Sequence, residues 1–243
     1  ARSVGLHRRH PHRKLTMPSF SLFRCVVRLT GGRVGGFLLG GLWAVTAHAQ
    51  PVVQTYLHQH QQAPLIAPAP NPQTAGAPWI RIGIASQTLT FFDARGHALR
   101  WYPIATAKRG VGETENSYQT PRGWHRVCEK IGDNAPADTI ISRRTVTPWQ
   151  YTPALHAEFP QKDWILTRII WLCGTELGLN QGTREDGVVV DSYARYIYIH
   201  GAGGHVSMGT PSSLGCVRMT SDTVIDLFEQ LPVGTEILID EHA

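Results

Sequence analysis

Acidic residues are missing from the first 33 positions of the chain, where eight of the 23 Lys and Arg residues lie. The rest of the chain therefore carries 15 basic residues against all 18 acidic ones, a net charge of −3. The sequence pI of about 9.2 reflects this basic N-terminal segment rather than the body of the protein. A mildly acidic body has no electrostatic attraction for phosphate backbones, so we expect no nucleic-acid partner.

Long apolar runs are also missing. The run at residues 35–47 is thirteen residues long, short of the ~20 that a membrane-spanning helix needs. It follows the basic segment and ends at Ala47-His48-Ala49, which predicts a signal peptide over residues 17–49 and export to the periplasm or cell envelope. The alternative is an uncleaved anchor; after cleavage no stable membrane span remains. Residues 1–16 precede Met17 and are either translated from an upstream start or an extension outside the natural protein.

Cysteine is scarce, with four residues in the chain. Cys25 lies in the leader before the apolar run, where a lipid-attachment cysteine would not be placed. The mature chain keeps Cys128, Cys173 and Cys216, an odd number that leaves one free thiol and two cysteines that are either disulfide-bonded or buried. Because no C-x2-C or H-x3-H spacing is present, we expect no metal site.

Residues 50–78 are rich in Pro, Gln and Ala and contain one aromatic residue, Tyr56. Such a segment buries too little apolar surface to offset its ordering entropy, so we expect a flexible linker. His58 and His60 belong to it and are interpreted as linker residues rather than metal ligands. The folded domain is expected over residues 79–240.

Alternating apolar residues between turn signals predict strands in that domain, at residues 80–84, 88–93, 98–104, 123–131, 193–199 and 236–240. Helical spacing is confined to residues 162–173 and 222–231, the second with Ser221 or Asp222 as N-cap. No internal repeat is visible. The pattern predicts a mainly β domain of sandwich or barrel type with one or two short helices.

The strongest chemical pattern lies near the C-terminus. His200-Gly201 closes the apolar run at residues 196–199, and Cys216 follows His200 by sixteen residues, within Ser213-Leu214-Gly215-Cys216-Val217-Arg218-Met219. A thiol needs a neighbouring base to become a thiolate, and a strand-end histidine beside a returning loop supplies one. The pattern predicts Cys216 as nucleophile and His200 as general acid and base. The alternatives are a buried structural cysteine and a core or surface histidine.

Residues around Cys216 have more than one role open to them. Gly215 allows close approach of the backbone, and its N–H and that of Cys216 are candidate oxyanion donors. Arg218 either binds a substrate carboxylate or braces the loop through backbone carbonyls. Ser213 is a candidate for substrate binding or for hydrogen bonds within the loop.

This constellation resembles the YkuD family of L,D-transpeptidases. The family motif is a strand ending in His-Gly, a glycine-containing loop and then Ser-X-Gly-Cys, here residues 199–201, 202–212 and 213–219. Thr120-Pro121-Arg122-Gly123 is similar to the family's Thr-Pro-X-Gly segment, and residues 232–239 to its closing Gly-Thr strand. The resemblance extends from about Trp79 to Asp240 and implies the family's β fold.

The resemblance also implies a reaction. Cys216 would attack the third residue of a peptidoglycan tetrapeptide stem, D-alanine would leave, and an amine of a second stem or of an envelope lipoprotein would resolve the thioester. The Gly201 carbonyl would orient the imidazole, which leaves Asp191 and Asp222 as weak candidates for an acidic partner. No metal or organic cofactor is required. The rival functions are an L,D-carboxypeptidase or amidase, in which water replaces the amine, and a non-catalytic wall-binding module.

Four features depart from the pattern or leave a choice. Leu214 replaces the second histidine of the commonest family form. Residues 149–191 exceed a minimal member and are interpreted as an insertion beside the cleft, or as a packing element. The turn-rich residues 109–116 lack a P-loop ending and are expected in a loop beside the cleft. His205 is a rival base, but His200 is anchored by a strand and is preferred.

Overall fold

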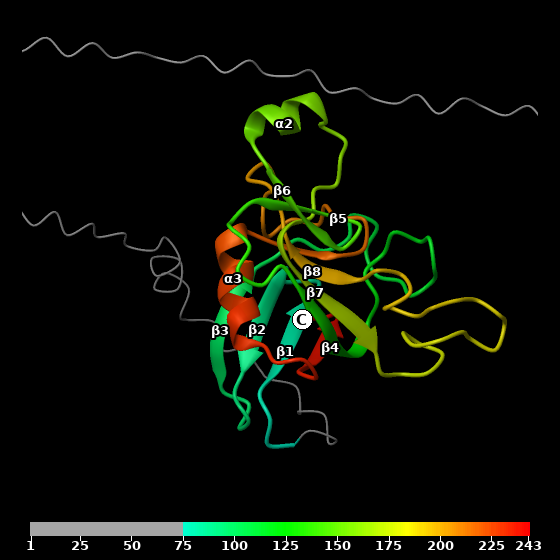
Figure 1. Ribbon diagram of the computed structural model, residues 1–243. Helices are drawn as coiled ribbons and strands as arrows, with labels where there is room; N and C mark the ends of the chain where they lie inside the picture. Colours follow the sequence, from blue (N-terminus) through cyan, green and yellow to red (C-terminus); the bar gives the residue numbers. More distant parts are fainter. Residues whose placement is uncertain (1–74) are drawn as a thin grey trace, which may run out of the picture. The chain divides into compact units, whose positions relative to one another are not determined.

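A computed structural model describes residues 75–243 of the protein (Figure 1). The described range contains ten strands and two helices, which confirms the expected mainly β fold. In chain order these are β1 (Trp79–Gly83), β2 (Thr88–Phe92), β3 (Ala98–Pro103), β4 (Gly123–Ile131), β5 (Thr139–Ser142), β6 (Thr145–Gln150), α2 (Pro153–Glu158), β7 (Leu166–Gly174), β8 (Tyr198–Gly201), β9 (Val217–Met219), α3 (Ser221–Gln230) and β10 (Glu236–Asp240). The expected leader and residues 50–74 of the expected linker lie before the described range, and both segments stay predictions.

The strands form one sheet in the order β3-β2-β1-β10-β4-β7. Strand β5 pairs with the start of β7 and with β6. Strand β8 pairs with the other edge of β7, and β9 pairs with β8. The β1–β10 and β8–β9 pairs are parallel and the other named pairs are antiparallel. Two backbone hydrogen bonds of 2.9 Å join Ala105, just after β3, to Arg218 in β9. The sheet is not closed into a barrel, although this contact brings its two ends together.

Helix α3 completes the main core. Its apolar residues Val224, Leu227 and Phe228 are buried against side chains from the sheet. The helix confirms the expectation for residues 222–231, but its N-cap is Thr220, whose hydroxyl accepts a hydrogen bond from the Thr223 N–H. A threonine hydroxyl satisfies one of the free N–H groups of the first turn, the role that had been expected for Ser221 or Asp222.

Residues 162–173 do not form the helix that was expected. They contain most of β7, a nine-residue strand whose side chains are buried at every position except Cys173. A central strand covered on both faces shows a continuous apolar run instead of alternation, and such a run also satisfies helical spacing. Residues 149–191 are therefore not an insertion as a whole, because β7 lies within them between β4 and β8.

The aromatic run before His200 is mostly a turn. Strand β8 begins at Tyr198 rather than at Tyr193. The Asp191 carboxylate accepts the Ala194 N–H at 2.9 Å, and Tyr196 has a positive φ of 59°. An aspartate that hydrogen-bonds its own following backbone favours a turn, which overrides the alternation of aromatic residues there.

Cys128 and Cys173 form a disulfide, which confirms one of the two expected fates of this pair. They lie on the neighbouring strands β4 and β7, with Cα atoms 5.8 Å apart, inside the range that a disulfide can bridge. Cys216 is the free cysteine of residues 75–243. Within the same range, no helix is long and apolar enough to cross a membrane.

Candidate active site

Strands β8 and β9 place the predicted catalytic residues on one face of the sheet. The strands are parallel, with Ile199 opposite Val217 and His200 opposite Arg218. Ile199 and Val217 enter the main core, whereas Cys216 packs against a second apolar cluster. Because side chains alternate along a strand, His200, Cys216 and Arg218 face the side away from the main core. The two strands therefore bring together residues that are sixteen positions apart in the sequence.

The His200 imidazole is held in one tautomer. Its Nδ1 atom lies 2.8 Å from the Gly201 carbonyl oxygen, which only accepts, so Nδ1 carries the proton in the neutral ring. Burial lowers the pKa of His200, with the negative charge of Asp163 opposing that shift. The Nε2 atom is buried without a hydrogen-bond partner. Its lone pair is therefore available to accept a proton, as a general base requires.

Cys216 is a neutral thiol at rest. Its Sγ donates to the Tyr196 carbonyl at 3.4 Å, and burial raises the pKa of Cys216 to about 12. The positive charges of Arg218 and Arg195 lower that pKa, but less than burial raises it. The raised pKa of Cys216 and the lowered pKa of His200 both favour the neutral thiol and the neutral imidazole over an ion pair.

The turn before Cys216 is fixed by its own hydrogen bonds. Gly215 has a φ of +129°, a conformation that side-chain-bearing residues rarely adopt. The Ser213 hydroxyl is buried, donates to the Cys216 carbonyl at 2.5 Å and accepts the Gly215 N–H at 3.2 Å. Ser213 thus makes contacts inside the loop. Leu214 lies between these residues with an exposed side chain.

Thr120 supports the same turn from a distant part of the chain. Its buried hydroxyl donates to the Gly215 carbonyl at 2.9 Å and accepts the Ala107 N–H at 3.0 Å. The sequence identified Thr120 as part of a motif but assigned it no role. These contacts give the motif a structural role, because they fix the backbone next to Cys216.

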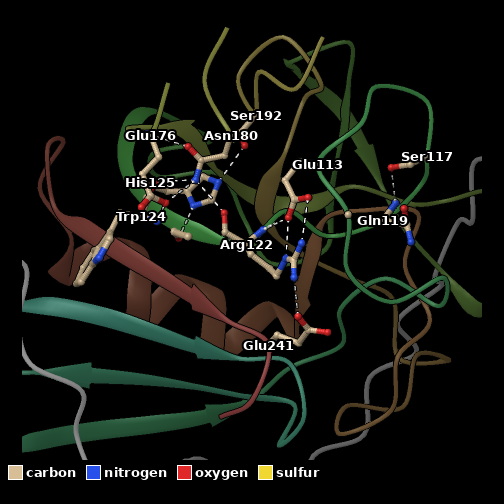
Figure 2. A network of polar contacts seen from close by, with 12 residues as sticks. Glu113, Ser117, Gln119, Arg122, Trp124, His125, Glu176, Asn180, Ser192 and Glu241 are labelled. Carbon is tan, nitrogen blue, oxygen red and sulfur yellow. Dashed lines mark hydrogen bonds and ion pairs between the residues drawn. The ribbon is translucent and has the colours of Figure 1, made fainter. Parts of the chain in front are cut away.

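A polar network holds the segment that follows Thr120 (Figure 2). Arg122 forms ion pairs of 2.8 Å with Glu113 and with Glu241, and its carbonyl accepts the Asn180 side chain at 2.8 Å. His125 is buried between the Gly123 carbonyl and the Ser192 hydroxyl, each at 2.9 Å, and burial lowers its pKa to about 4. The network joins residues 109–119 to Arg122, and residues 175–192 to Arg122 and the start of β4.

Arg218 is held by protein partners. Its Nη2 atom forms a 2.6 Å ion pair with Asp163, and Nη1 donates to the Ser212 carbonyl at 3.1 Å. Asp163 is thus the carboxylate beside the catalytic face, a residue that the sequence did not indicate. Asp191, the earlier candidate, instead accepts backbone N–H groups of its own loop. Nothing in the spacing of Asp163 could reveal it, because it precedes Arg218 by 55 positions.

Arg195 is a second partly buried cation near the thiol. Its Nη2 atom donates to the Gln119 carbonyl at 2.8 Å and the Gly112 carbonyl at 3.2 Å, while Nη1 is buried without a partner. These bonds join the loop of residues 109–119 to the turn that precedes β8. The loop packs beside the catalytic residues, since Lys108 N–H also donates to the Ser213 carbonyl at 3.0 Å.

His205 belongs to a different cluster from Cys216. Its Nδ1 atom lies 2.8 Å from the Tyr151 hydroxyl, and its ring stacks on His156 of α2 with centroids 3.7 Å apart. The cluster ties the loop after β8 to the segment around α2. Burial lowers the pKa of His205, and the neighbouring His156 acts in the same direction.

Comparisons with known proteins agree on one family. Residues 77–239 match the family model described as the YkuD L,D-transpeptidase catalytic domain. The probable L,D-transpeptidase ErfK/SrfK of Escherichia coli K12 is 22% identical over 160 residues, which cover 66% of this chain and 43% of that protein. The probable L,D-transpeptidase YbiS of the same organism is 28% identical over 134 residues, 51% of this chain and 41% of that one. The chain thus spans less than half the length of these relatives.

Two solved structures match at lower sequence identity. An L,D-transpeptidase from Mycobacterium smegmatis is 19% identical, with a TM-score of 0.40 over 67% of this chain and 58% of that one. Bd1075 of Bdellovibrio bacteriovorus is 16% identical, with a TM-score of 0.44 over 71% and 50% of the respective chains. Since the family model covers most of the chain and every described strand except the end of β10, the protein belongs to the YkuD family of L,D-transpeptidase catalytic domains.

Proposed function

We propose that the protein is an exported peptidoglycan L,D-transpeptidase that works through a thioester on Cys216. The observation that carries the proposal is the arrangement of Cys216 and His200 on the same face of β8 and β9, with the His200 Nε2 atom buried and unpartnered. Family membership supports the reaction class. Export to the periplasm or cell envelope rests on the leader-like residues 17–49.

The first half of the reaction forms the acyl-enzyme. The sulfur of Cys216 attacks the carbonyl carbon of the third residue of a tetrapeptide stem, while His200 Nε2 takes the thiol proton. The Gly201 carbonyl, 2.8 Å from Nδ1, stabilises the imidazolium that results. The tetrahedral intermediate then breaks its C–N bond, and the imidazolium gives its proton to the amine of the leaving D-alanine.

The second half transfers the acyl group. An amine of a second stem, or of an envelope lipoprotein, attacks the thioester and gives a proton to His200 through Nε2. The C–S bond breaks, and the thiolate recovers that proton. Backbone N–H groups of Cys216 and Gly215 are the proposed oxyanion donors. The Gly215 N–H already donates to Ser213 Oγ at 3.2 Å, so it must share or exchange that partner.

Arg218 and Ser213 are assigned roles within this scheme. Arg218 positions the loop through its contacts with Asp163 and Ser212, which supports the bracing role over carboxylate binding. Ser213 fixes the turn that carries Cys216 and orients substrate only through that turn. The alternative of water as acceptor, an L,D-carboxypeptidase or amidase, uses the same acyl-enzyme. A non-catalytic wall-binding module would have no need of the His200–Cys216 arrangement.

Incubation of the protein with purified muropeptides tests these alternatives. We expect cross-linked dimers with loss of D-alanine, and a thioester adduct on the wild type that is absent from Cys216→Ala. Tripeptide products without dimers would indicate the hydrolase. A carbapenem gives an independent test, because the reactive thiol should form a covalent adduct. If wild type and Cys216→Ala both keep an unmodified mass with every reagent, the nucleophile assignment is wrong.

A further inference from the structure

The hairpin β5–β6 carries an arginine pair in an unfavourable conformation. Ser142 pairs with Thr145, so Arg143 and Arg144 form a two-residue turn, and their φ angles are +50° and +64°. Positive φ at both central residues is typical of a type I′ turn, in which Asn-Gly is strongly preferred. Two arginines are a poor choice for forming such a turn. Strained residues of this kind are retained where their side chains serve a function.

The Arg144 side chain lies over an aromatic surface. Its guanidinium carbon is 4.8 Å from the Tyr196 ring centroid and 5.4 Å from that of Trp171. The hydroxyl groups of Tyr198 and Tyr196 lie beside the guanidinium and raise the pKa of Arg144. Cation–π contacts of this geometry orient a guanidinium without neutralising its charge.

This aromatic surface adjoins the nucleophile. The Tyr196 carbonyl accepts the Cys216 thiol at 3.4 Å, so the residue under the guanidinium also contacts the sulfur. Cys216 packs against the cluster that contains Trp171, Tyr198 and Ile141, and Ile141 belongs to the strand that leads into the arginine turn. Figure 1 shows the β5–β6 hairpin beside β7 and β8. The hairpin thus holds Arg144 at the edge of the reactive face.

The Arg144 charge has no counter-ion in the described part of the chain. None of the ion pairs of residues 75–243 involves Arg144. Glu129 accepts a short hydrogen bond from the hydroxyl of Tyr193, which packs against this aromatic cluster. Arg218, by contrast, is already paired with Asp163. An exposed, oriented and unpaired guanidinium next to a nucleophile is suited to an anionic group of the substrate.

We propose that Arg144 is a carboxylate-binding subsite for the acyl donor. The inference rests on the proposed function, because it concerns the peptide that acylates Cys216. Two carboxylates of a tetrapeptide donor lie near the attacked carbonyl: the C-terminal carboxylate of the leaving D-alanine, and a side-chain carboxylate on the third residue. Either is matched by the planar fork of an arginine, and the test separates them.

The test compares Arg144→Gly with its matched control Arg143→Gly in the full chain. Both changes place glycine at a positive-φ position, so both should raise the thermal unfolding midpoint. Each protein is given three synthetic tetrapeptides: one with both carboxylates free, one with a C-terminal amide and one with the third side chain amidated. The rate of acyl-enzyme formation is followed by intact mass.

We expect Arg144→Gly to lower the kcat/KM of acylation by about tenfold for the free peptide, mostly through KM, because one charge pair is lost. The same variant should be indistinguishable from wild type with the peptide whose amidation removes the recognised carboxylate. That peptide shows which of the two carboxylates Arg144 binds. Arg143→Gly should keep the wild-type preference. Arg144→Gly should therefore gain stability and lose its selection among the three peptides. If Arg144 had a purely structural role, this combination would not occur.

Two results would overturn the proposal in distinguishable ways. If wild type acylates all three peptides at equal rates, or if the two glycine variants lose activity equally, Arg144 is not the subsite and the proposed function stands. If wild type forms no acyl-enzyme with any of the three peptides, the proposed function fails, and the subsite fails with it.

Discussion

His125 and His200 are both fully buried, and in both the Nδ1 atom lies within 2.9 Å of a glycine carbonyl oxygen. Burial lowers the pKa of each. The difference is at Nε2. In His125 this atom meets the Ser192 hydroxyl at 2.9 Å, as Figure 2 shows, whereas in His200 it is buried without a partner. The comparison teaches that burial and a lowered pKa are shared by the two histidines, whereas the free Nε2 atom, which the proposed general base needs, belongs to His200 alone of this pair.

The largest expected effect is a difference in acylation rate between variants of His200 and of His125. His200→Ala should reduce acylation of Cys216 by about a thousandfold or more, because general acid–base catalysis is lost. His125→Gln should keep the rate per folded molecule within about threefold of wild type, although its stability falls. Acylation is measured with a carbapenem by intact mass, and folding by circular dichroism. Equal losses of acylation rate in the two folded variants would contradict the assignment of His200 as the base and of His125 as a structural residue.

The second expected effect is a pH dependence of the free energy of unfolding that comes from buried His125. The pKa of His125 is lowered from 6.5 to about 4, so the unfolded chain binds the proton more tightly. The stability contributed by neutral His125 is thus complete above about pH 6.5 and is lost as the pH falls towards 4, by about 3 kcal/mol. Urea unfolding at pH 7.5 and pH 4 should show this loss. His125→Gln should reduce it, and an unchanged pH dependence in that variant would contradict the assignment.

A smaller effect on the acylation rate should come from Thr120, whose hydroxyl contacts Gly215 and Ala107. Thr120→Val removes the hydroxyl that fixes the Gly215 carbonyl, so acylation should fall by about tenfold through a misplaced nucleophile. Thr175→Val is the control, since its hydroxyl also donates to a backbone carbonyl, that of Trp124, away from the turn before Cys216. If both variants acylate at the same rate, the turn does not depend on Thr120.

The smallest effect is expected at His205. His205→Ala breaks the contacts of the imidazole with Tyr151 and His156, which lie apart from the Cys216 sulfur and the Gly215 turn. The acylation rate should change by less than about threefold, with any loss confined to the KM for a peptide donor. A loss as large as that of His200→Ala would make His205 the base.

The sequence was most reliable where one face of a strand is buried. The expected strands at residues 123–131 and 236–240 match β4 and β10 residue for residue. It failed at β7, where burial on both faces removes the alternation, and at residues 193–197, where an Asp191 turn interrupts it. The hairpin β5–β6 was not expected, because its arginine turn carries none of the usual turn residues.

The sequence by itself identified the family and predicted the nucleophile and the base, because a His-Gly strand end and a Gly-Cys turn at fixed spacing require particular residue types. Only the tertiary structure decided which distant groups surround them. Asp163, Thr120, Arg195 and Arg144 reach the site from separate loops and strands, and their identities follow no local period. The physical reason is that alternation and turn chemistry act over a few residues, whereas the environment of the thiol is created by strands that pair across the sheet.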